Sequence, residues 1–231
     1  MTMDKDTQAQ PDLQLLDKDA NAEDMLKQYQ QQLADLPGNA EPLQRAKIEL
    51  DIAEALLALE RNSEAFISAR RCLNIFIDNS AWQHATEACD VMFQADQKDS
   101  VIALGHGVWL AVTYPVEPTT SVAMMNHIVD ETPNDSDGAA VAAITAQYIV
   151  DMRAADEQHE SLSFLTMQII ANVARRHSNV ETQDQMDFWR ERLELNDPQL
   201  FLPRLSQVVN VMVGDKWWFD REELRARLPI H

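Results

Sequence analysis

Six histidines are the residues of this chain best suited to acid–base chemistry or metal binding, namely His84, His106, His127, His159, His177 and His231. None belongs to a His-Glu-x-x-His motif, and none lies three residues after a glutamate, the spacing used in di-iron helix bundles. His84 and Glu87 would share one helix face, but a facing pair is needed to complete a metal site. We therefore expect no metal, no cofactor and no identifiable catalytic residue.

Two cysteines, Cys72 and Cys89, lie inside helix-like segments, and we expect them to be buried as small hydrophobic side chains rather than joined in a disulfide. The chain contains neither a Gly-x-Ser-x-Gly motif nor a P-loop. Its acidic residues are spread along the polar faces of helix-like segments, so the sequence singles out no pair of carboxylates.

Gly105-His106-Gly107 is the most unusual local cluster, and it lies inside the apolar run 101–112. Glycines without a Cβ allow two helices to cross closely, which we favour, or allow a ligand to approach the backbone. A lone Gly-x-Gly with no preceding strand is not a dinucleotide motif. The alternative use of this region is a pocket near His106, Trp109 and Tyr114, as in a small all-helical enzyme or ligand-binding protein.

The segment 214–231 combines three adjacent aromatic residues with a short basic helix. Asp220 is the expected N-cap of that helix and Glu223 its capping-box partner. We expect the aromatic residues to cap the last helical layer. The alternative is a binding anchor, because aromatic residues and arginine dominate interface hot spots; its residues would be Trp217, Trp218, Phe219, Arg221 and Arg225.

The segment 114–118, Tyr-Pro-Val-Glu-Pro, breaks the helical pattern near the middle of the chain. We expect a connector, with a peptide-binding loop carrying Tyr114 and Glu117 as the alternative. Acidic helical maturation chaperones of redox enzymes carry a similar Glu-Pro hinge, but the Asp-His pair that continues their motif is absent here.

The formal net charge of −19 is carried mostly by residues 1–150, and the basic residues of 151–231 are arginines except Lys216. Such a chain is repelled by phosphate backbones and anionic lipid, so we expect a protein or peptide partner and no nucleic acid or membrane partner. We expect the acidity to serve solubility, and the alternative is a surface that attracts a basic partner. No apolar stretch is long enough to span a bilayer, and the first residues do not resemble a signal peptide. We therefore expect a cytoplasmic protein.

Five glycines in 231 residues, together with long Ala-, Leu- and Gln-rich stretches, predict an all-α fold of stacked antiparallel helical hairpins. Residues 1–20 are expected to form a disordered acidic tail, and 21–231 a single domain. Ser63 is an expected N-cap. The β-like run 208–213 also fits a helix that Gly214 would end. The expected helices span 21–36, 42–59, 64–77, 81–95, 99–113, 119–131, 137–153, 158–177, 182–195, 199–213 and 220–228.

Residues 46–79 resemble a tetratricopeptide repeat, a helical hairpin of 34 residues. Ile52-Ala53 followed by Leu56 is similar to the large, small and large positions of the first helix of that repeat. Ala65, Cys72 and Leu73 stand where small and aliphatic residues seat the second helix. Ala69 replaces the usual aromatic residue and Ile77 the usual proline. The resemblance implies a helical-hairpin stack that binds peptides or proteins on its concave face.

From this organisation we expect a non-enzymatic adaptor, scaffold or client-specific chaperone that binds a protein or peptide in a groove between hairpins. Assembly or maturation of a redox or multi-subunit enzyme is one alternative. A small enzyme and a structural subunit of a larger assembly are others. The sequence leaves the oligomeric state open.

Overall fold

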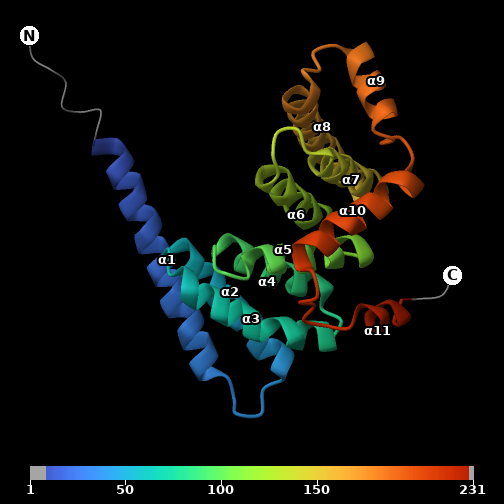
Figure 1. The fold of residues 1–231 in the computed structure, drawn as a ribbon. Helices are drawn as coiled ribbons and strands as arrows, with labels where there is room; N and C mark the ends of the chain where they lie inside the picture. Colours follow the sequence, from blue (N-terminus) through green and yellow to red (C-terminus); the bar gives the residue numbers. More distant parts are fainter. Residues whose placement is uncertain (1–8, 229–231) are drawn as a thin grey trace, which may run out of the picture.

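The computed structural model describes the backbone of residues 9–228 and the side chains of residues 20–228. Within this range the chain is all-α, without a strand (Figure 1). The described helices are α1 (Ala9–Asp35), α2 (Pro42–Ala58), α3 (Asn62–Asp78), α4 (Trp82–Gln94), α5 (Ser100–Thr113), α6 (Pro118–Glu131), α7 (Asp137–Arg153), α8 (Asp156–Ser178), α9 (Gln183–Arg192), α10 (Pro198–Val213) and α11 (Arg221–Ala226).

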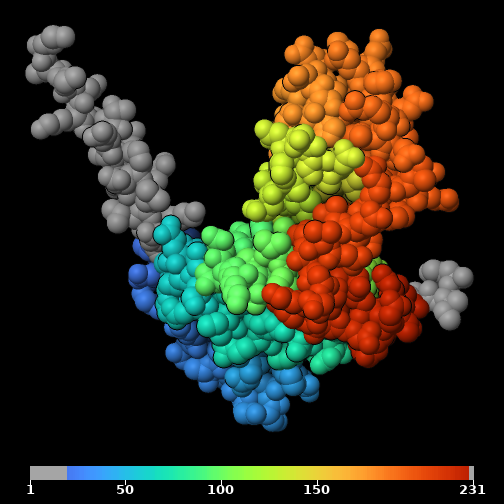
Figure 2. Space-filling view, in the orientation of Figure 1, coloured from blue at the N-terminus to red at the C-terminus, as the bar shows by residue number. Residues whose placement is uncertain are grey.

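From α1 to α8, each helix packs against the next one in the sequence, as expected for stacked hairpins with short connections. The even-numbered helices also contact one another, α2 with α4, α4 with α6 and α6 with α8. These four helices therefore form one side of the stack. The molecule is bent, and α6–α9 form an arm that stands at an angle to α2–α5 (Figure 2).

The last long helix leaves this order, because α10 returns to pack on α5 and α7. As a result α5 is covered by α4, α6 and α10, and its residues from Ile102 to Ala111 are all buried. A helix that is apolar on every side needs such complete burial. One hydrophobic cluster extends from Leu26 on α1 to Leu224 on α11.

Five of the turns between the described helices have a residue other than glycine in the left-handed position. The residues just after α2, α3, α4, α8 and α9 have positive φ angles, and they are Glu60, Ser80, Asp96, Asn179 and Glu194. After α2 the Arg61 N–H donates to the Leu56 carbonyl, and after α3 the Ala81 N–H donates to the Phe76 carbonyl. This is the hydrogen bond of a Schellman turn, which is usually made with glycine in the left-handed position.

Helix ends agree with the sequence at several positions. Asp220 accepts hydrogen bonds from the N–H groups of Glu222 and Glu223, which confirms it as an N-cap, and Ser136 accepts one from the Gly138 N–H at the start of α7. The Glu223 side chain pairs with Arg227 instead, so the capping box expected between Glu223 and Asp220 does not form. Thr182 and Gln185 form a capping box at the start of α9 that the sequence analysis missed.

Two boundaries differ from expectation. Ser63 is not an N-cap, because α3 already begins at Asn62 and its N-cap residue, Arg61, makes no side-chain capping bond. α1 begins at Ala9 rather than at Asn21. Residues 1–8 lie outside the described range, so disorder of the acidic tail stays a prediction there. The run 208–213 is helical, as part of α10.

Candidate functional site

The aromatic segment after α10 packs onto α5 around one fully buried histidine, His106. The His106 ring stacks on Trp218 with centroids 4.4 Å apart, and it meets Trp217 and Phe219 at 4.9 Å each. His106 Nδ1 lies 2.7 Å from the Ile102 carbonyl, and its Nε2 accepts the Trp218 backbone N–H at 2.9 Å. His106 therefore fixes a segment far away in the sequence.

These two hydrogen bonds define a neutral imidazole, with the proton on Nδ1 donated to Ile102 and Nε2 free to accept. Burial, together with smaller effects of the nearby charges of Arg70 and Arg221, lowers the pKa of His106 to about 4. The bond to Ile102 acts in the opposite direction but is outweighed.

Three arginines cover the aromatic rings from outside. Arg70 of α3 lies 4.4 Å from the centroid of Trp218, and Arg221 lies 3.9 Å from that of Trp217. Such contacts stabilise an exposed aromatic surface by about 0.5–1 kcal/mol each. Arg225 lies farther away, 5.8 Å from Trp109.

The rings of Trp217, Trp218 and Phe219 are half-buried and packed on the core, an arrangement that agrees with a cap over α5. Partner binding by these residues, Arg221 and Arg225 stays a prediction.

The connector 114–118 contacts α4 and α11. Tyr114 is buried, stacks on Trp82 at 3.7 Å, and donates its hydroxyl to the Leu224 carbonyl of α11. Glu117 is exposed, and its backbone N–H donates to the Gln83 side chain of α4. Tyr114 thus anchors α11, whereas the Glu117 carboxylate remains at the surface.

Both glycines beside His106 allow close helix packing, which confirms the favoured interpretation of this cluster. A Cβ on Gly105 would overlap Val213 of α10. A Cβ on Gly107 would lie 2.9 Å from the Cβ of Cys89 on α4 and 2.7 Å from the sulfur of Met124 on α6.

The alternative pocket near His106, Trp109 and Tyr114 is largely filled by these aromatic contacts. Trp109 lines a cavity of about 120 Å³ between α5 and α10, with Arg225 at its edge. His106 has no exposed surface. A substrate would reach its imidazole only after the C-terminal segment moved away.

A second group of charged residues gathers on the even-numbered side of the stack. Asp51 and Glu54 on α2 lie near Glu87 and Asp90 on α4, and we call these four residues the acidic face. Glu54 still contacts solvent, yet its pKa is raised to about 7, first by the surrounding protein and then by the charges of Glu87, Asp51 and Asp90.

The pKa of Asp51 is raised as well, again mainly by burial. His84 has the opposite, smaller effect on Asp51, and Glu87 adds to the increase. The carboxylates therefore repel one another across the contact between α2 and α4.

Polar contacts extend this face to α6. His127 Nε2 lies 2.8 Å from an Asp90 oxygen, and the Gln83 amide donates at 2.8 Å to both Glu87 and Thr120. These bonds hold α4 and α6 side by side. Within residues 20–228, no three His, Cys, Asp or Glu side chains are grouped as metal ligands.

The acidic face was missed by the sequence analysis, which treated acidic residues as evenly spread. A signal was present, because Asp51 and Glu54 have the same three-residue spacing as Glu87 and Asp90, on helices that are both first members of a hairpin. Only the side-by-side contact of α2 and α4 brings the two pairs together.

The cysteines are buried and unpaired with each other, as expected. Burial raises the pKa of Cys72 to about 12 and raises that of Cys89 still further, so neither is a reactive thiolate.

Among the described helices, none has the length and apolar character needed to cross a membrane. Comparison with family models, curated proteins and solved structures finds no match to this chain.

Proposed function

We propose that this protein is an interaction module, an adaptor or client-specific chaperone, that binds a basic segment of another protein on its acidic face. The observation that carries the proposal is the close grouping of Asp51, Glu54, Glu87 and Asp90, where burial first and the neighbouring carboxylates second raise the pKa of Glu54 to about 7. Folding has brought these carboxylates together against their mutual repulsion, so a positively charged partner would relieve an existing cost.

The partner's charge follows from the pairing pattern. Within the described part of the chain, no Lys or Arg forms an ion pair with these four carboxylates, and Asp90 alone pairs with a histidine. Lys or Arg side chains of a bound peptide would supply the missing positive charge. The overall charge of −19 would also speed the encounter with such a partner.

The arrangement of helices supports a peptide as the occupant. The segment that resembles a tetratricopeptide repeat, 46–79, corresponds to α2, the following turn and α3. The resemblance of this hairpin implies binding of a peptide or protein on the concave face of a helical stack. The acidic face lies on α2 and α4, the first helices of two successive hairpins.

The test is calorimetric titration with a peptide of about twelve residues that carries Arg at every third position, against a counterpart with citrulline in place of Arg. We expect the Arg peptide to bind and the citrulline peptide to bind at least about tenfold more weakly, because citrulline keeps the shape and removes the charge. Binding should weaken as salt is added.

The decisive variant is Glu54→Gln with Glu87→Gln, which removes two ionisable carboxyl groups from the acidic face. Its matched control is Asp184→Asn with Asp187→Asn, which removes two charges from exposed positions on α9. The proposal requires that only the first pair weakens binding. Equal weakening by both pairs would show that net charge alone attracts the peptide and would overturn the assignment to this face.

A further inference from the structure

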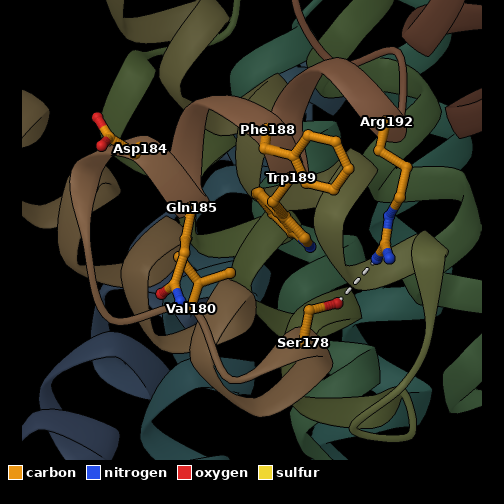
Figure 3. Close-up of a pocket in the computed structure, with 7 residues that line it drawn as sticks. All are labelled: Ser178, Val180, Asp184, Gln185, Phe188, Trp189 and Arg192. Carbon is orange, nitrogen blue, oxygen red and sulfur yellow. Dashed lines mark hydrogen bonds between the residues drawn. The ribbon is translucent and has the colours of Figure 1, made fainter.

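A second site lies at the far end of the arm, where the chain turns from α8 into α9. Asn179 ends α8 with φ of 52°, and the capping box at Thr182 starts α9 three residues later. The turn leaves a cavity of about 310 Å³ between the end of α8 and one face of α9 (Figure 3). A cavity of this size is at the lower limit for small-molecule sites and suits one large side chain with its attached group.

The walls of this cavity are mainly apolar. Trp189 is buried at its base beside Val180, and Phe188 stands at its rim with 65% of its surface exposed. A phenylalanine so exposed at the edge of an open cavity has an unused contact surface. Burial of that ring by a ligand would contribute roughly as much as burial of a core side chain.

One cation is held at the mouth of the cavity. The Nη2 of Arg192 donates to the Ser178 hydroxyl at 2.9 Å, and Ser178 lies 2.7 Å from His177 Nδ1. His177 Nε2 lies 3.1 Å from Asp137, and Trp189 also donates to His177 Nδ1. This series of hydrogen bonds fixes where Arg192 lies, while Ser178 is its one side-chain hydrogen-bond partner among the described residues.

The charges around the cavity favour an anion at the Arg192 end. Arg192 is the basic residue that lines the cavity. Of the other arginines in the last turns of α8 and α9, Arg176 donates to the Val129 carbonyl and Arg190 lines a different cavity. Asp184 also lines the cavity, but Figure 3 shows its carboxylate at the opposite end, pointing away from the aromatic rings. Arg192 is seen reaching down beside Phe188 and Trp189.

We propose that this cavity binds a hydrophobic carboxylate, with an aromatic or large aliphatic group against Phe188 and Trp189 and the carboxylate paired with Arg192. In a protein ligand, this chemistry is found at a free C-terminus that ends in such a residue. A guanidinium pairs with a carboxylate through two parallel hydrogen bonds, which gives the site its direction. The site is separate from the acidic face and does not depend on the function proposed for that face.

The test uses three probes: 3-phenylpropionate, its neutral amide, and an N-acetylated tripeptide ending in Phe with a free carboxylate. Binding is followed through the indole N–H resonance of Trp189, assigned with Trp189→Phe. We expect the two acids to shift this resonance with saturation and the amide to bind about tenfold or more weakly. Tighter binding of the tripeptide would identify a chain terminus as the ligand, and tighter binding of the free acid a small molecule.

Arg192→Gln should weaken acid binding about tenfold. Arg192→Lys should restore part of the binding, because lysine carries the positive charge but cannot donate the two parallel hydrogen bonds of a guanidinium. Arg175→Gln removes an exposed charge from the same corner and should leave binding unchanged. Phe188→Ala tests the apolar wall without touching the cation. The proposal is overturned if acid and amide bind equally, if Arg192→Gln behaves as Arg175→Gln does, or if Trp189 shows no shift at about 10 mM probe.

Discussion

His106 shows how one side chain can join two parts of a chain. Its ring accepts a hydrogen bond from Trp218, 112 positions away, and donates one within its own helix. The sequence shows His106 between two glycines inside an apolar run, and it correctly predicted that these glycines allow close helix packing. The bond to Trp218 could not be predicted, because no local pattern specifies which distant backbone N–H reaches a buried imidazole.

We predict that His106 makes stability depend on pH between about 6.5 and 4. The folded pKa is lowered from 6.5 to about 4, so within this window the unfolded chain binds a proton that the folded chain excludes. Stability from this group is full above pH 6.5 and falls as the pH falls, by up to about 3 kcal/mol near pH 4. Urea unfolding at several pH values measures it.

The comparison uses His106→Leu, which removes the titrating group, and His159→Gln as a partly exposed control. His106→Leu should also lose about 2 kcal/mol at pH 7, because the Trp218 N–H is left without its acceptor. An unchanged pH dependence in His106→Leu would contradict this account.

The pH dependence of stability that Glu54 causes has the opposite sign to that of His106. Its folded pKa is raised from 4.5 to about 7, so the folded chain holds the extra proton, and stability from this group falls as the pH rises through that range. Carboxyl carbon NMR should give a midpoint near pH 7 for Glu54. Glu87→Gln should lower that midpoint by removing the largest neighbouring charge, whereas Glu191→Gln on α9 should not. A midpoint near 4.5 in the unaltered protein would remove the main support for the acidic face.

At the scale of helices, local patterns predicted most of the structure. Apart from α1, every described helix begins and ends within three residues of its expected bounds. This success reflects apolar periodicity interrupted by short polar turns, which are both local properties. Ser63 misled because a good capping residue near a helix start need not be the residue that caps it.

The packing of α10 on α5 and α7 could not be predicted from local sequence patterns. Its apolar residues indicate a buried face but do not say that this face returns to α5 and α7 instead of continuing the stack. The acidic face was missed for the same reason, since it exists only where α2 meets α4.

Gly107→Ala tests the close packing of α5 against α4. The new methyl group would meet the Cβ of Cys89, which is fixed to its backbone and cannot rotate away. We expect a loss of about 1–3 kcal/mol in the free energy of unfolding. Gly38→Ala, where no atom lies within 4 Å, should cost nothing. Equal effects of the two substitutions in thermal or urea unfolding would show that α5 and α4 can separate freely.

In the turns after α2 and α3, substitution to glycine is expected to stabilise the protein. Glu60 and Ser80 occupy the left-handed region, with φ of 57° and 55°, where side chains with a Cβ are strained. Glu60→Gly and Ser80→Gly should each raise the free energy of unfolding by about 0.5–1 kcal/mol. Gln30→Gly, inside α1, should lower it by about 1 kcal/mol. Destabilisation by all three would mean that chain entropy outweighs the relief of strain.

Over the whole molecule, the excess of negative charge opposes compaction. A net charge of −19 on one chain creates a repulsion that salt screens, and few of the acidic side chains are paired with bases. The unfolding temperature should therefore rise by several degrees between about 50 mM and 500 mM KCl. Sorbitol at equal osmolality serves as the uncharged control. A temperature that falls or stays constant in KCl would show that favourable ion pairs outweigh the repulsion.

Because α10 and the aromatic segment cover α5, the apolar surface of α5 stays exposed during part of translation. α5 is the most apolar of the described helices, and it leaves the ribosome long before the residues that enclose it, since Trp218 follows His106 by 112 positions. A nascent chain that ends near residue 190 exposes apolar surface of α5 that the finished protein hides. The growing chain is therefore most prone to aggregate in that interval, which ends when α10 and the aromatic segment pack on α5.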